Sequence, residues 1–203
     1  MKDIKVIAWD FDGVLTRNVV EGRFIWADDF EADIGHSRAH FEDCIFGKDL
    51  NAVLTGKEDL RDRVETWATS VGYAPGPDAL IKYWFEKDAH LDPVMINLMD
   101  RVAQKGLRQV ITTNNEARRT AYIEKNLDFG NKVEHIFASG RMGIAKPDAE
   151  YFETVSTALN VNPDQIFFID DMAENTKAAR DFGWHTLHFT DETRHTLEAL
   201  LPL

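Results

Sequence analysis

The 203-residue chain has a single cysteine, Cys44, and no long apolar run. One cysteine cannot close a disulfide within the chain, and a free thiol is typical of a reducing compartment. No apolar stretch approaches the roughly 18 residues that a membrane helix needs, and the charged first ten residues do not resemble a secretory signal. We therefore expect a cytoplasmic protein that makes no contact with a membrane.

Positive charge is also scarce. Lys and Arg number 23 against 35 Asp and Glu, so the formal net charge is −12 at pH 7. A field of this sign repels phosphate backbones, and nucleic acid is therefore not an expected partner. Hydrophobic residues make up 44% of the chain, which suffices for a full core, and the length fits one domain with or without an insertion. The sequence leaves monomer and homodimer open.

Short apolar runs rich in β-branched and aromatic residues recur in the second half of the chain, and amphipathic helical stretches follow them. Several runs are apolar at every position, as in strands that helices cover on both faces. This rhythm predicts an α/β fold with a doubly wound parallel sheet. The expected strands are 6–9, 110–113, 135–138, 166–169 and 186–189.

Three helix starts are predicted from local sequence. Asp92 and Pro93 have the pattern of an N-cap and a first helical residue, and Pro147 is expected to open another helix. The segment from Thr55 to Glu58 has the capping-box pattern and precedes apolar residues at helical spacing. The apolar face expected after Pro93 consists of Met95, Leu98, Met99 and Val102.

About a hundred residues separate the first expected strand from the second, far more than a crossover between parallel strands requires. These residues have helical rather than strand patterns, and they include Trp26, Trp67 and Trp84, which can pack a small core. We expect a helical cap at residues 16–90, inserted into a core domain that comprises residues 1–15 and 91–203.

Polar side chains follow three of the strands and occupy one loop. Each group has an ordinary interpretation by itself: a polar turn, a helix cap, or a solvated lysine after two glycines. For the asparagines after the second strand, a helix cap is the preferred interpretation when they are considered alone. The residues are Asp10 and Asp12, Thr113, Asn114 and Asn115, Lys146, and Asp170 and Asp171.

Considered together, these groups point to one site, because the carboxyl ends of parallel strands share one edge of the sheet. Carboxylates this close repel each other by several kcal/mol unless a cation or a proton intervenes. Oxygen ligands without His or Cys favour Mg²⁺ over zinc. Hydroxyl, lysine and backbone N–H donors suit the oxygens of an anion. The sequence therefore predicts a magnesium-dependent phosphoryl site.

Four segments resemble the motifs of the haloacid dehalogenase (HAD) superfamily, in the same order and with a long insertion after the first. The resemblance covers nearly the whole chain. Around the last two motifs, the sequence is most similar to small sugar-phosphate phosphatases with a helical cap. It implies a Rossmann-like core, Mg²⁺ as cofactor, and hydrolysis of a small phosphorylated metabolite, with sugar phosphates among the candidates. The segments are DFDGVLT at 10–16, TN at 113–114, MGIAKPD at 142–148 and FFIDDMAEN at 167–175.

The resemblance also implies roles for single residues. Asp10 would be the nucleophile that forms an aspartyl-phosphate, and Asp12 the general acid and then the general base. Thr113 and the backbone of Asn114 would hold phosphoryl oxygens, while Lys146 would offset the charge between nucleophile and phosphate.

For the metal, the resemblance implies Asp10, the main-chain carbonyl of Asp12, and Asp171 as ligands of Mg²⁺. Asp170 would bind the ion directly or through a water molecule. Of the last two carboxylates, we favour Asp171 as the direct ligand.

Other functions use similar groups. A dehalogenase of the same superfamily lacks an aspartate at the position of Asp12, so phosphoryl transfer is favoured over carbon–halogen cleavage. A phosphomutase would use the same core. Outside this superfamily, a phospho-aspartate receiver domain has a different order of motifs and a shorter chain, and a noncatalytic binding module would not need every chemical group that is present here.

Substrate choice is expected to depend on the cap. His36 and His40 have a spacing that can bind zinc, but the segment lacks the glutamate of the zincin motif, so no metal is expected there. The weakly indicated contact residues are Glu21, Arg23, Trp26, His36, Arg38 and His40.

Overall fold

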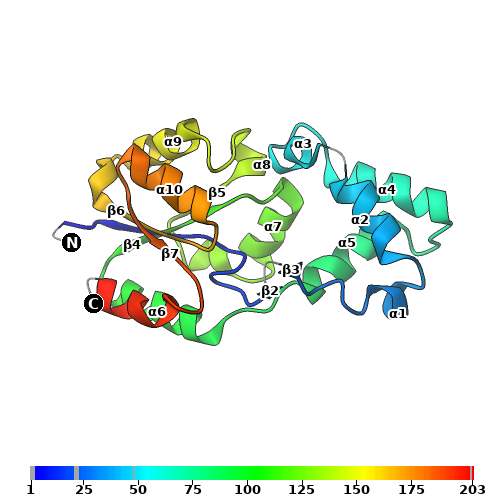
Figure 1. Cartoon of the computed structure of the whole chain (residues 1–203), viewed down its shortest axis with the longest axis horizontal. Helices are drawn as coiled ribbons and strands as arrows, with labels where there is room; N and C mark the ends of the chain where they lie inside the picture. The colour runs from blue at the N-terminus through cyan, green and yellow to red at the C-terminus, as the bar shows by residue number, and fades with distance from the viewer. Residues whose placement is uncertain (1–2, 21–22, 48, 202) are drawn as a thin grey trace.

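The computed structural model describes residues 3–20, 23–47, 49–201 and 203. Its core is a five-stranded sheet in the order β5-β4-β1-β6-β7, and all neighbouring strands are parallel. The predicted doubly wound sheet is therefore confirmed, with β4 starting two residues earlier than expected and β7 one residue earlier (Figure 1). The strands are β1 (Val6–Trp9), β4 (Arg108–Thr113), β5 (His135–Ala138), β6 (Ile166–Asp170) and β7 (His185–His188).

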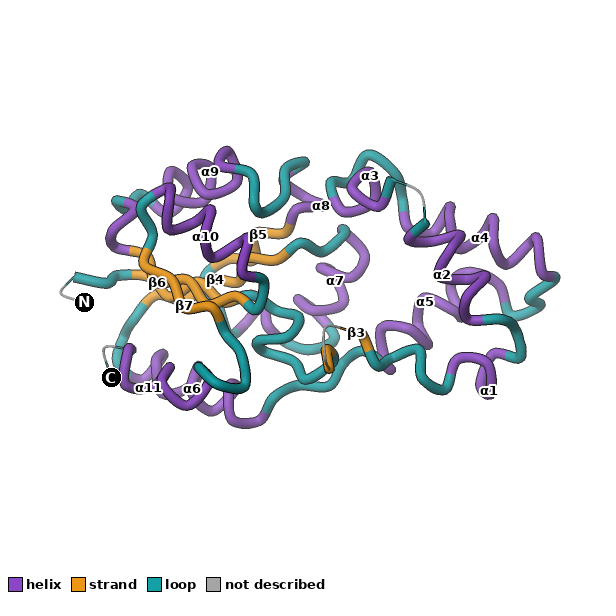
Figure 2. Tube along the Cα trace, in the orientation of Figure 1, coloured by secondary structure: helices purple, strands orange, loops and turns teal. Residues whose placement is uncertain are grey.

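Helices cover both faces of this sheet (Figure 2). Alternate strand residues such as Trp9 and Ile111 pack with α6 and α11 on one face, while Ala8, Val110 and Phe168 pack with α9 and α10 on the other. These strands are buried on both faces, which explains why they read as continuous apolar runs. The helices are α6 (Pro93–Gln104), α7 (Ala117–Lys125), α8 (Ser139–Met142), α9 (Ala149–Leu159), α10 (Ala173–Phe182) and α11 (Leu197–Leu200), with 3₁₀ turns at Phe129–Asn131, Pro163–Gln165 and Arg194–Thr196.

One of the three predicted helix starts is confirmed and two are wrong. Asp92 caps α6 by accepting hydrogen bonds from the amides of Val94 and Met95. The helix expected at Pro147 starts instead at Ala149, because the carboxylate of Asp148 accepts a hydrogen bond from the amide of Glu150 and caps it.

The capping box expected at Thr55 is also wrong. Thr55 ends α3 (Leu50–Leu54), and its hydroxyl donates to the carbonyl of Asn51 at 2.6 Å. Helix α4 (Leu60–Val71) is capped by Asp59, which accepts from the amide of Arg61. The glutamate that the capping box would use is engaged elsewhere, since Glu58 pairs with Arg63 at 2.6 Å.

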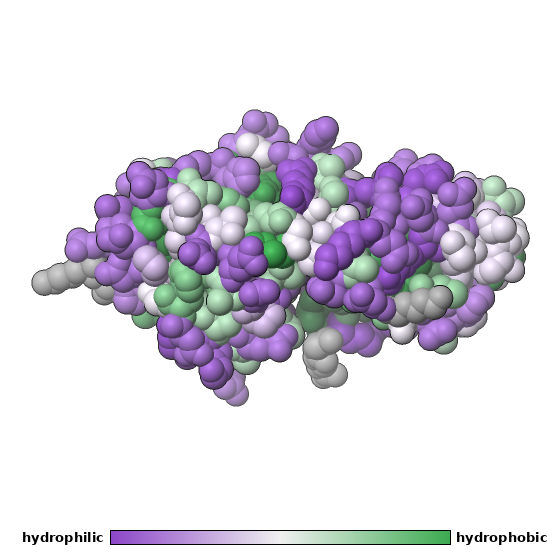
Figure 3. All heavy atoms as spheres, turned by 90° about the horizontal axis from the view of Figure 1, so that it is seen from above, coloured by the Kyte–Doolittle hydropathy of each residue, from purple (hydrophilic) through white to green (hydrophobic). Residues whose placement is uncertain are grey.

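The segment between β1 and α6 is mainly helical and lies beside the sheet (Figure 1). It has its own cluster of buried residues, in which Trp26, Phe30, Phe41 and Trp67 pack together. Figure 3 shows the surface narrowing between this segment and the core. Among the described residues, no helix is long and apolar enough to cross a membrane. The remaining elements of the segment are β2 (Val19–Val20), β3 (Arg23–Phe24), α1 (Phe30–Ile34), α2 (Arg38–Phe46) and α5 (Gly76–Lys87).

The chain enters and leaves this helical segment at one place. Thr16 and Leu91 form an isolated antiparallel bridge, and the amide of Asp92 donates to the carbonyl of Leu15 at 2.9 Å. We propose on this ground that the cap comprises residues 16–90 and the core residues 1–15 and 91–203, because both linkers cross together at these positions.

Asp92 connects this crossing to the core. Its carboxylate is fully buried, and besides capping α6 it pairs with Arg17 at 3.0 Å and with Arg194. Burial would raise the pKa of Asp92, but Arg194 and Arg17 outweigh it and lower the pKa, so the carboxylate is ionised at neutral pH.

Replacing Asp92 by alanine removes the cap and both ion pairs at once. We expect Asp92→Ala to lower the free energy of unfolding by about 2–4 kcal/mol. Asp100→Ala is the matched control, because Asp100 is an exposed aspartate of the same helix that pairs with Lys132 at 3.1 Å, and exposed pairs contribute at most about 1 kcal/mol. Urea unfolding measures both variants, and equal losses would show that Asp92 has no special role.

Candidate active site

Three carboxylates meet at the carboxyl edge of the sheet. Asp10 follows β1, and Asp170 and Asp171 come at the end of the neighbouring strand β6. One oxygen from each carboxylate lies within 4.8 Å of the others. The topology thus brings together two acidic segments that are separated by about 160 residues in the sequence.

Lys146 reaches this group from the loop between α8 and α9. Its side chain is buried, and its Nζ lies 3.1 Å from Asp10 Oδ1 and 2.6 Å from Asp170 Oδ2. It also donates to the carbonyl of Thr112 at 2.8 Å. Burial alone would lower the pKa of Lys146, but Asp10 and Asp170 raise it above its ordinary value. This lysine is therefore a charged member of the site and not a solvated surface residue.

The single lysine does not relieve all the repulsion among the carboxylates. Burial, together with Asp170, Asp171 and Asp12, holds the pKa of Asp10 well above its usual range although Lys146 opposes the shift. Burial and Asp170 raise the pKa of Asp171 to about 6. A second cation would stabilise both ionised forms.

The donor set fits Mg²⁺. All three ligand candidates are carboxylates, and oxygens within 4.8 Å of one another need to move little to reach the separation of about 4 Å between opposite ligands in an octahedral Mg²⁺ shell. Neither His nor Cys belongs to the group, which disfavours zinc.

Asp170 and Asp171 differ in how they are held. Asp170 Oδ1 accepts from the amide of Met172 at 2.7 Å, both its oxygens lie 3.1 Å from Asn175 Nδ2, and Oδ2 pairs with Lys146. Both oxygens of Asp170 therefore have partners within the protein.

Gly13 forms the wall behind Asp171. Its φ is +74°, and a Cβ placed on it would lie 2.4 Å from Asp171 Oδ2. Only glycine allows both this backbone conformation and this approach, so the DFDG turn determines where the Asp171 carboxylate lies.

Asn114 and Asn115 do not cap the helix that follows them, which corrects the interpretation preferred for these residues alone. Helix α7 is capped by Glu116, whose carboxylate accepts from the amide of Arg118 at 2.6 Å. The side chain of Asn114 instead exchanges two hydrogen bonds with the main chain of Lys146, at 2.7 and 2.9 Å. Asn114 thereby holds the lysine loop against the end of β4.

The carboxylate of Asp12 lies outside the three-carboxylate group and is held by other partners. Asp12 Oδ1 accepts from Asn18 Nδ2 at 2.6 Å, and Oδ2 accepts from Asn115 Nδ2 at 2.8 Å. Asn115 also donates to the hydroxyl of Thr113, which is buried, at 2.7 Å. A guanidinium nitrogen of Arg119 lies 3.6 Å from Asp12 Oδ1.

Asp88 completes the surroundings of Asp12. It accepts from Asn18 Nδ2 at 2.9 Å and pairs with Arg119 at 2.9 Å. Burial and the charge of Asp12 raise the pKa of Asp88 to about 7, against the opposing effect of Arg119.

Sequence reasoning missed several of these residues. Asn18 and Asp88 each lie two residues inside the expected cap boundaries, so a search for polar groups at the two linkers would have found them. Arg119 lies one helical turn after Asn115, on the helix that follows the second motif. Asn175 lies on α10, five residues after Asp170, and this spacing was the signal that it could contact the Asp170 carboxylate.

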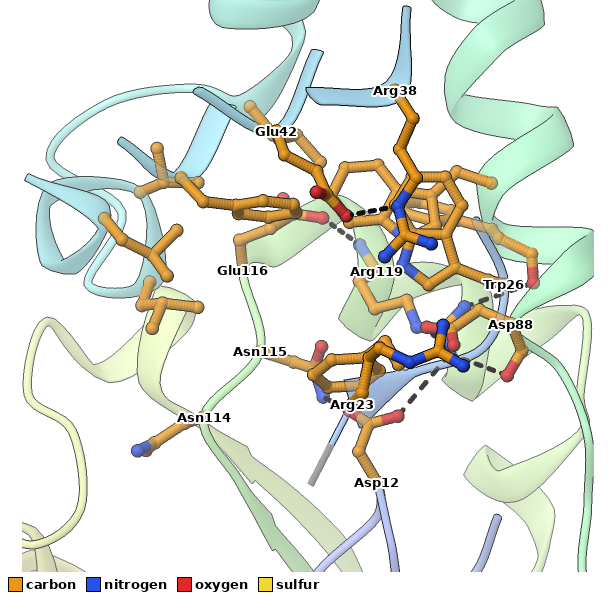
Figure 4. A pocket seen from close by; sticks show the side chains of 18 residues that line it. Asp12, Arg23, Trp26, Arg38, Glu42, Asp88, Asn114, Asn115, Glu116 and Arg119 are labelled. Atoms are coloured by element: carbon orange, nitrogen blue, oxygen red, sulfur yellow. Dashed lines mark hydrogen bonds and ion pairs between the residues drawn. The ribbon is translucent and has the colours of Figure 1, made fainter. Parts of the chain in front are cut away.

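A cavity of about 390 Å³ opens between cap and core, and Asp12 lines it (Figure 4). Of the weakly indicated cap residues, Arg23, Trp26 and Arg38 also line it. His36 does not, and its ring packs edge-on against Trp67 with the centroids 5.6 Å apart. His40 is not among the lining residues, and Glu21 lies outside the described residues.

The fold is thus a parallel α/β core with a long helical segment inserted after β1, and an acidic site at the carboxyl edge of its sheet. A family model for haloacid dehalogenase-like hydrolases matches residues 4–183, and the chain belongs to this family. The resemblance found from the four motifs is therefore confirmed, and so is the expectation that the chain is an enzyme.

Two curated relatives match about half of this chain. The mouse acyl-CoA dehydrogenase family member 10 is 31% identical over 111 residues, which span 54% of this chain and 10% of that protein. A sesquiterpene phosphatase of Aspergillus oryzae is 29% identical over 107 residues, which span 53% of this chain and 55% of the phosphatase.

A solved structure matches over nearly the whole chain. It is a HAD family enzyme of Bacteroides thetaiotaomicron in complex with magnesium and inorganic phosphate, with a TM-score of 0.72 and 22% identity. The match covers 92% of this chain and 94% of the Bacteroides chain. At this identity the comparison establishes the fold.

Gly13→Ala tests the geometry of the metal site directly. The added methyl group displaces the Asp171 carboxylate, and we expect Mg²⁺ affinity to fall about 10–100-fold, as for other changes that move a ligand. Gly35→Ala is the control, because Gly35 has a similar φ of +78° but nothing within 4 Å of its Cβ position. Calorimetric titration measures the Mg²⁺ affinity of both variants. Equal affinities would show that Gly13 does not determine the geometry of the metal site.

Proposed function

We propose that the protein is a Mg²⁺-dependent phosphatase that hydrolyses a small phosphorylated metabolite through an aspartyl-phosphate intermediate. One observation carries the proposal: Asp10 belongs to the three-carboxylate group beside Lys146, whereas Asp12 lies outside it and lines the cavity. This difference in surroundings supports Asp10 as the nucleophile and Asp12 as the general acid. The Bacteroides enzyme with bound magnesium and phosphate, and the relative named as a phosphatase, support this function.

Asp10 is oriented for attack by two donors. Its Oδ1 accepts from the amide of Phe11 at 2.7 Å and faces Lys146 Nζ at 3.1 Å. In the first step, a carboxylate oxygen of Asp10 forms a bond to phosphorus while the bond from phosphorus to the leaving oxygen breaks. Lys146 and the donors at Thr113 and Asn114 offset the charge of the phosphoryl oxygens.

Asp12 acts as the general acid and then as the general base. It donates a proton to the leaving oxygen in the first step and accepts one from water in the second, when water attacks phosphorus and releases phosphate and free Asp10. Asn18 and Asn115 hold both oxygens of Asp12, which fixes the carboxyl group toward the cavity.

Asp10, Asp171 and the carbonyl of Asp12 would hold Mg²⁺. Asp170 would hold Lys146 in place and bind the ion through a water molecule. When bound, Mg²⁺ neutralises charge between the nucleophile and the phosphoryl group.

Other activities of the same core are less well supported. Asp12 supplies a proton that carbon–halogen cleavage does not require, and no feature of the described residues favours a mutase. A receiver domain or a binding module would lack steady turnover. A cytoplasmic location and the absence of nucleic-acid partners remain part of the proposal, and they rest on the free Cys44 and the net charge of −12 respectively. Monomer and homodimer both stay open.

The proposal predicts steady hydrolysis of p-nitrophenyl phosphate in Mg²⁺ and its complete loss in EDTA. Asp10→Asn removes the nucleophile, so turnover is expected to disappear. Asp164→Asn is the control and should leave the rate unchanged, because this exposed aspartate precedes β6, at the opposite end of the strand from Asp170. Release of p-nitrophenolate measures both. Substantial activity in Asp10→Asn would refute the assignment of the nucleophile.

Asp12→Asn separates general acid catalysis from nucleophilic attack. For an alkyl phosphate, whose leaving oxygen must be protonated, we expect the rate of phosphoryl transfer to fall about 10²–10⁴-fold. For p-nitrophenyl phosphate the first step should lose less, because nitrophenolate leaves without a proton. Rapid-quench measurement of the first turnover compares the two substrates, and equal losses would place the proton donor elsewhere.

A further inference from the structure

The position of Asp12 determines which part of the substrate enters the cavity. A general acid must lie beside the leaving oxygen, so the group attached to that oxygen extends from Asp12 away from Asp10 and Lys146. The cavity of about 390 Å³ lies on this side, between cap and core. Its lining should therefore reflect the chemistry of the leaving alcohol.

The cap provides an apolar wall. Trp26 and Trp84 stack with their ring centroids 4.7 Å apart, and leucines from α3 and the start of α4 line another part of the cavity. The apolar residues of this wall include Trp26, Phe46, Leu50, Leu54, Leu60 and Trp84.

A buried charged residue of the lining is already paired. The guanidinium of Arg119 is buried, donates to the carbonyls of Phe85 and Asp88, and pairs with the Asp88 carboxylate at 2.9 Å. Asp88 in turn accepts from Asn18.

The other polar lining residues have partners within the protein as well. Asn115 donates to Asp12 and to Thr113, and Arg38 pairs with Glu42 at 2.7 Å. Glu116 caps α7. The hydroxyls of a sugar would have to compete with these contacts for hydrogen-bond partners, whereas a hydrocarbon chain needs none.

We propose that the substrate is a phosphate monoester of an apolar alcohol, with a hydrocarbon chain that fills the cavity against the cap leucines and tryptophans. This inference rests on the proposed phosphatase function and replaces sugar phosphates as the expected substrate class. The cavity volume lies at the small end of the roughly 300–1,000 Å³ of ligand pockets, which suits a chain of medium length.

A series of butyl, hexyl and octyl phosphate, with glucose 6-phosphate for comparison, tests the substrate class in Mg²⁺. We expect kcat/KM to rise about two- to fourfold for each added methylene until the cavity is full. The kcat/KM for glucose 6-phosphate is expected to be at least about tenfold lower than that for hexyl phosphate. A flat series, or a sugar phosphate that matches hexyl phosphate, overturns the inference.

A pair of variants tests whether the cavity is responsible. Leu54→Asn places a polar group in the apolar wall, and we expect the ratio of kcat/KM for octyl phosphate over glucose 6-phosphate to fall about tenfold or more. Leu200→Asn makes the same change at an exposed leucine of α11, outside the cavity, and should keep the ratio of the unmodified protein. An unchanged ratio in Leu54→Asn would show that the chain binds elsewhere.

The same measurements distinguish failure of the phosphatase function from failure of the substrate class. Absence of Mg²⁺-dependent turnover for p-nitrophenyl phosphate and all the esters refutes the phosphatase function, and the substrate class with it. Turnover of p-nitrophenyl phosphate without any preference for alkyl esters refutes the substrate class alone.

Discussion

The crowding of three carboxylates around one buried lysine is the constraint on which the site depends. The parallel order of β1 and β6 forces Asp10, Asp170 and Asp171 together, and Lys146 supplies one positive charge to this group. Buried charges are costly unless they are paired, so a further cation would stabilise the ionised form of this group. The proposed magnesium site and the proposed nucleophile both rest on this one arrangement.

The same constraint explains why two aspartates only two residues apart have different environments. Asp10 faces Lys146 within the core, whereas Asp12 faces Asn18 and Asn115. Because Asn18 lies beside the linker into the cap, the cap fixes the carboxyl group of Asp12 as well as enclosing the cavity. In the proposed mechanism, proton transfer and substrate choice thus depend on the same segment.

Much of this could be predicted from the sequence. Strands buried on both faces read as apolar runs, and the carboxyl edge of a parallel sheet collects whatever polar residues follow its strands, so Asp10, Thr113 and Asp170 could be expected near one another. Local patterns were less reliable at helix starts, since Thr55 and Asp59 both have cap-forming side chains and only the folded chain decides between them.

Contacts between cap and core could not be predicted. Asn18 and Asp88 are 70 residues apart, and Arg119 lies a further 31 residues along the chain from Asp88. Their meeting depends on how the two linkers cross, for which the sequence has no local signal. The paired state of the polar groups around the cavity is a result of the same packing, so the motifs alone could not indicate the substrate class proposed above.

Covalent catalysis at Asp10 is tested most directly by mass spectrometry of quenched reactions of Asp12→Asn, run in water enriched in ¹⁸O. The account predicts a phosphoryl group on Asp10 before turnover is complete, and solvent oxygen in the released phosphate only. No phosphoryl adduct at position 10, or solvent oxygen in the Asp10 carboxylate, would contradict it, since the latter requires attack of water on carbon instead of phosphorus.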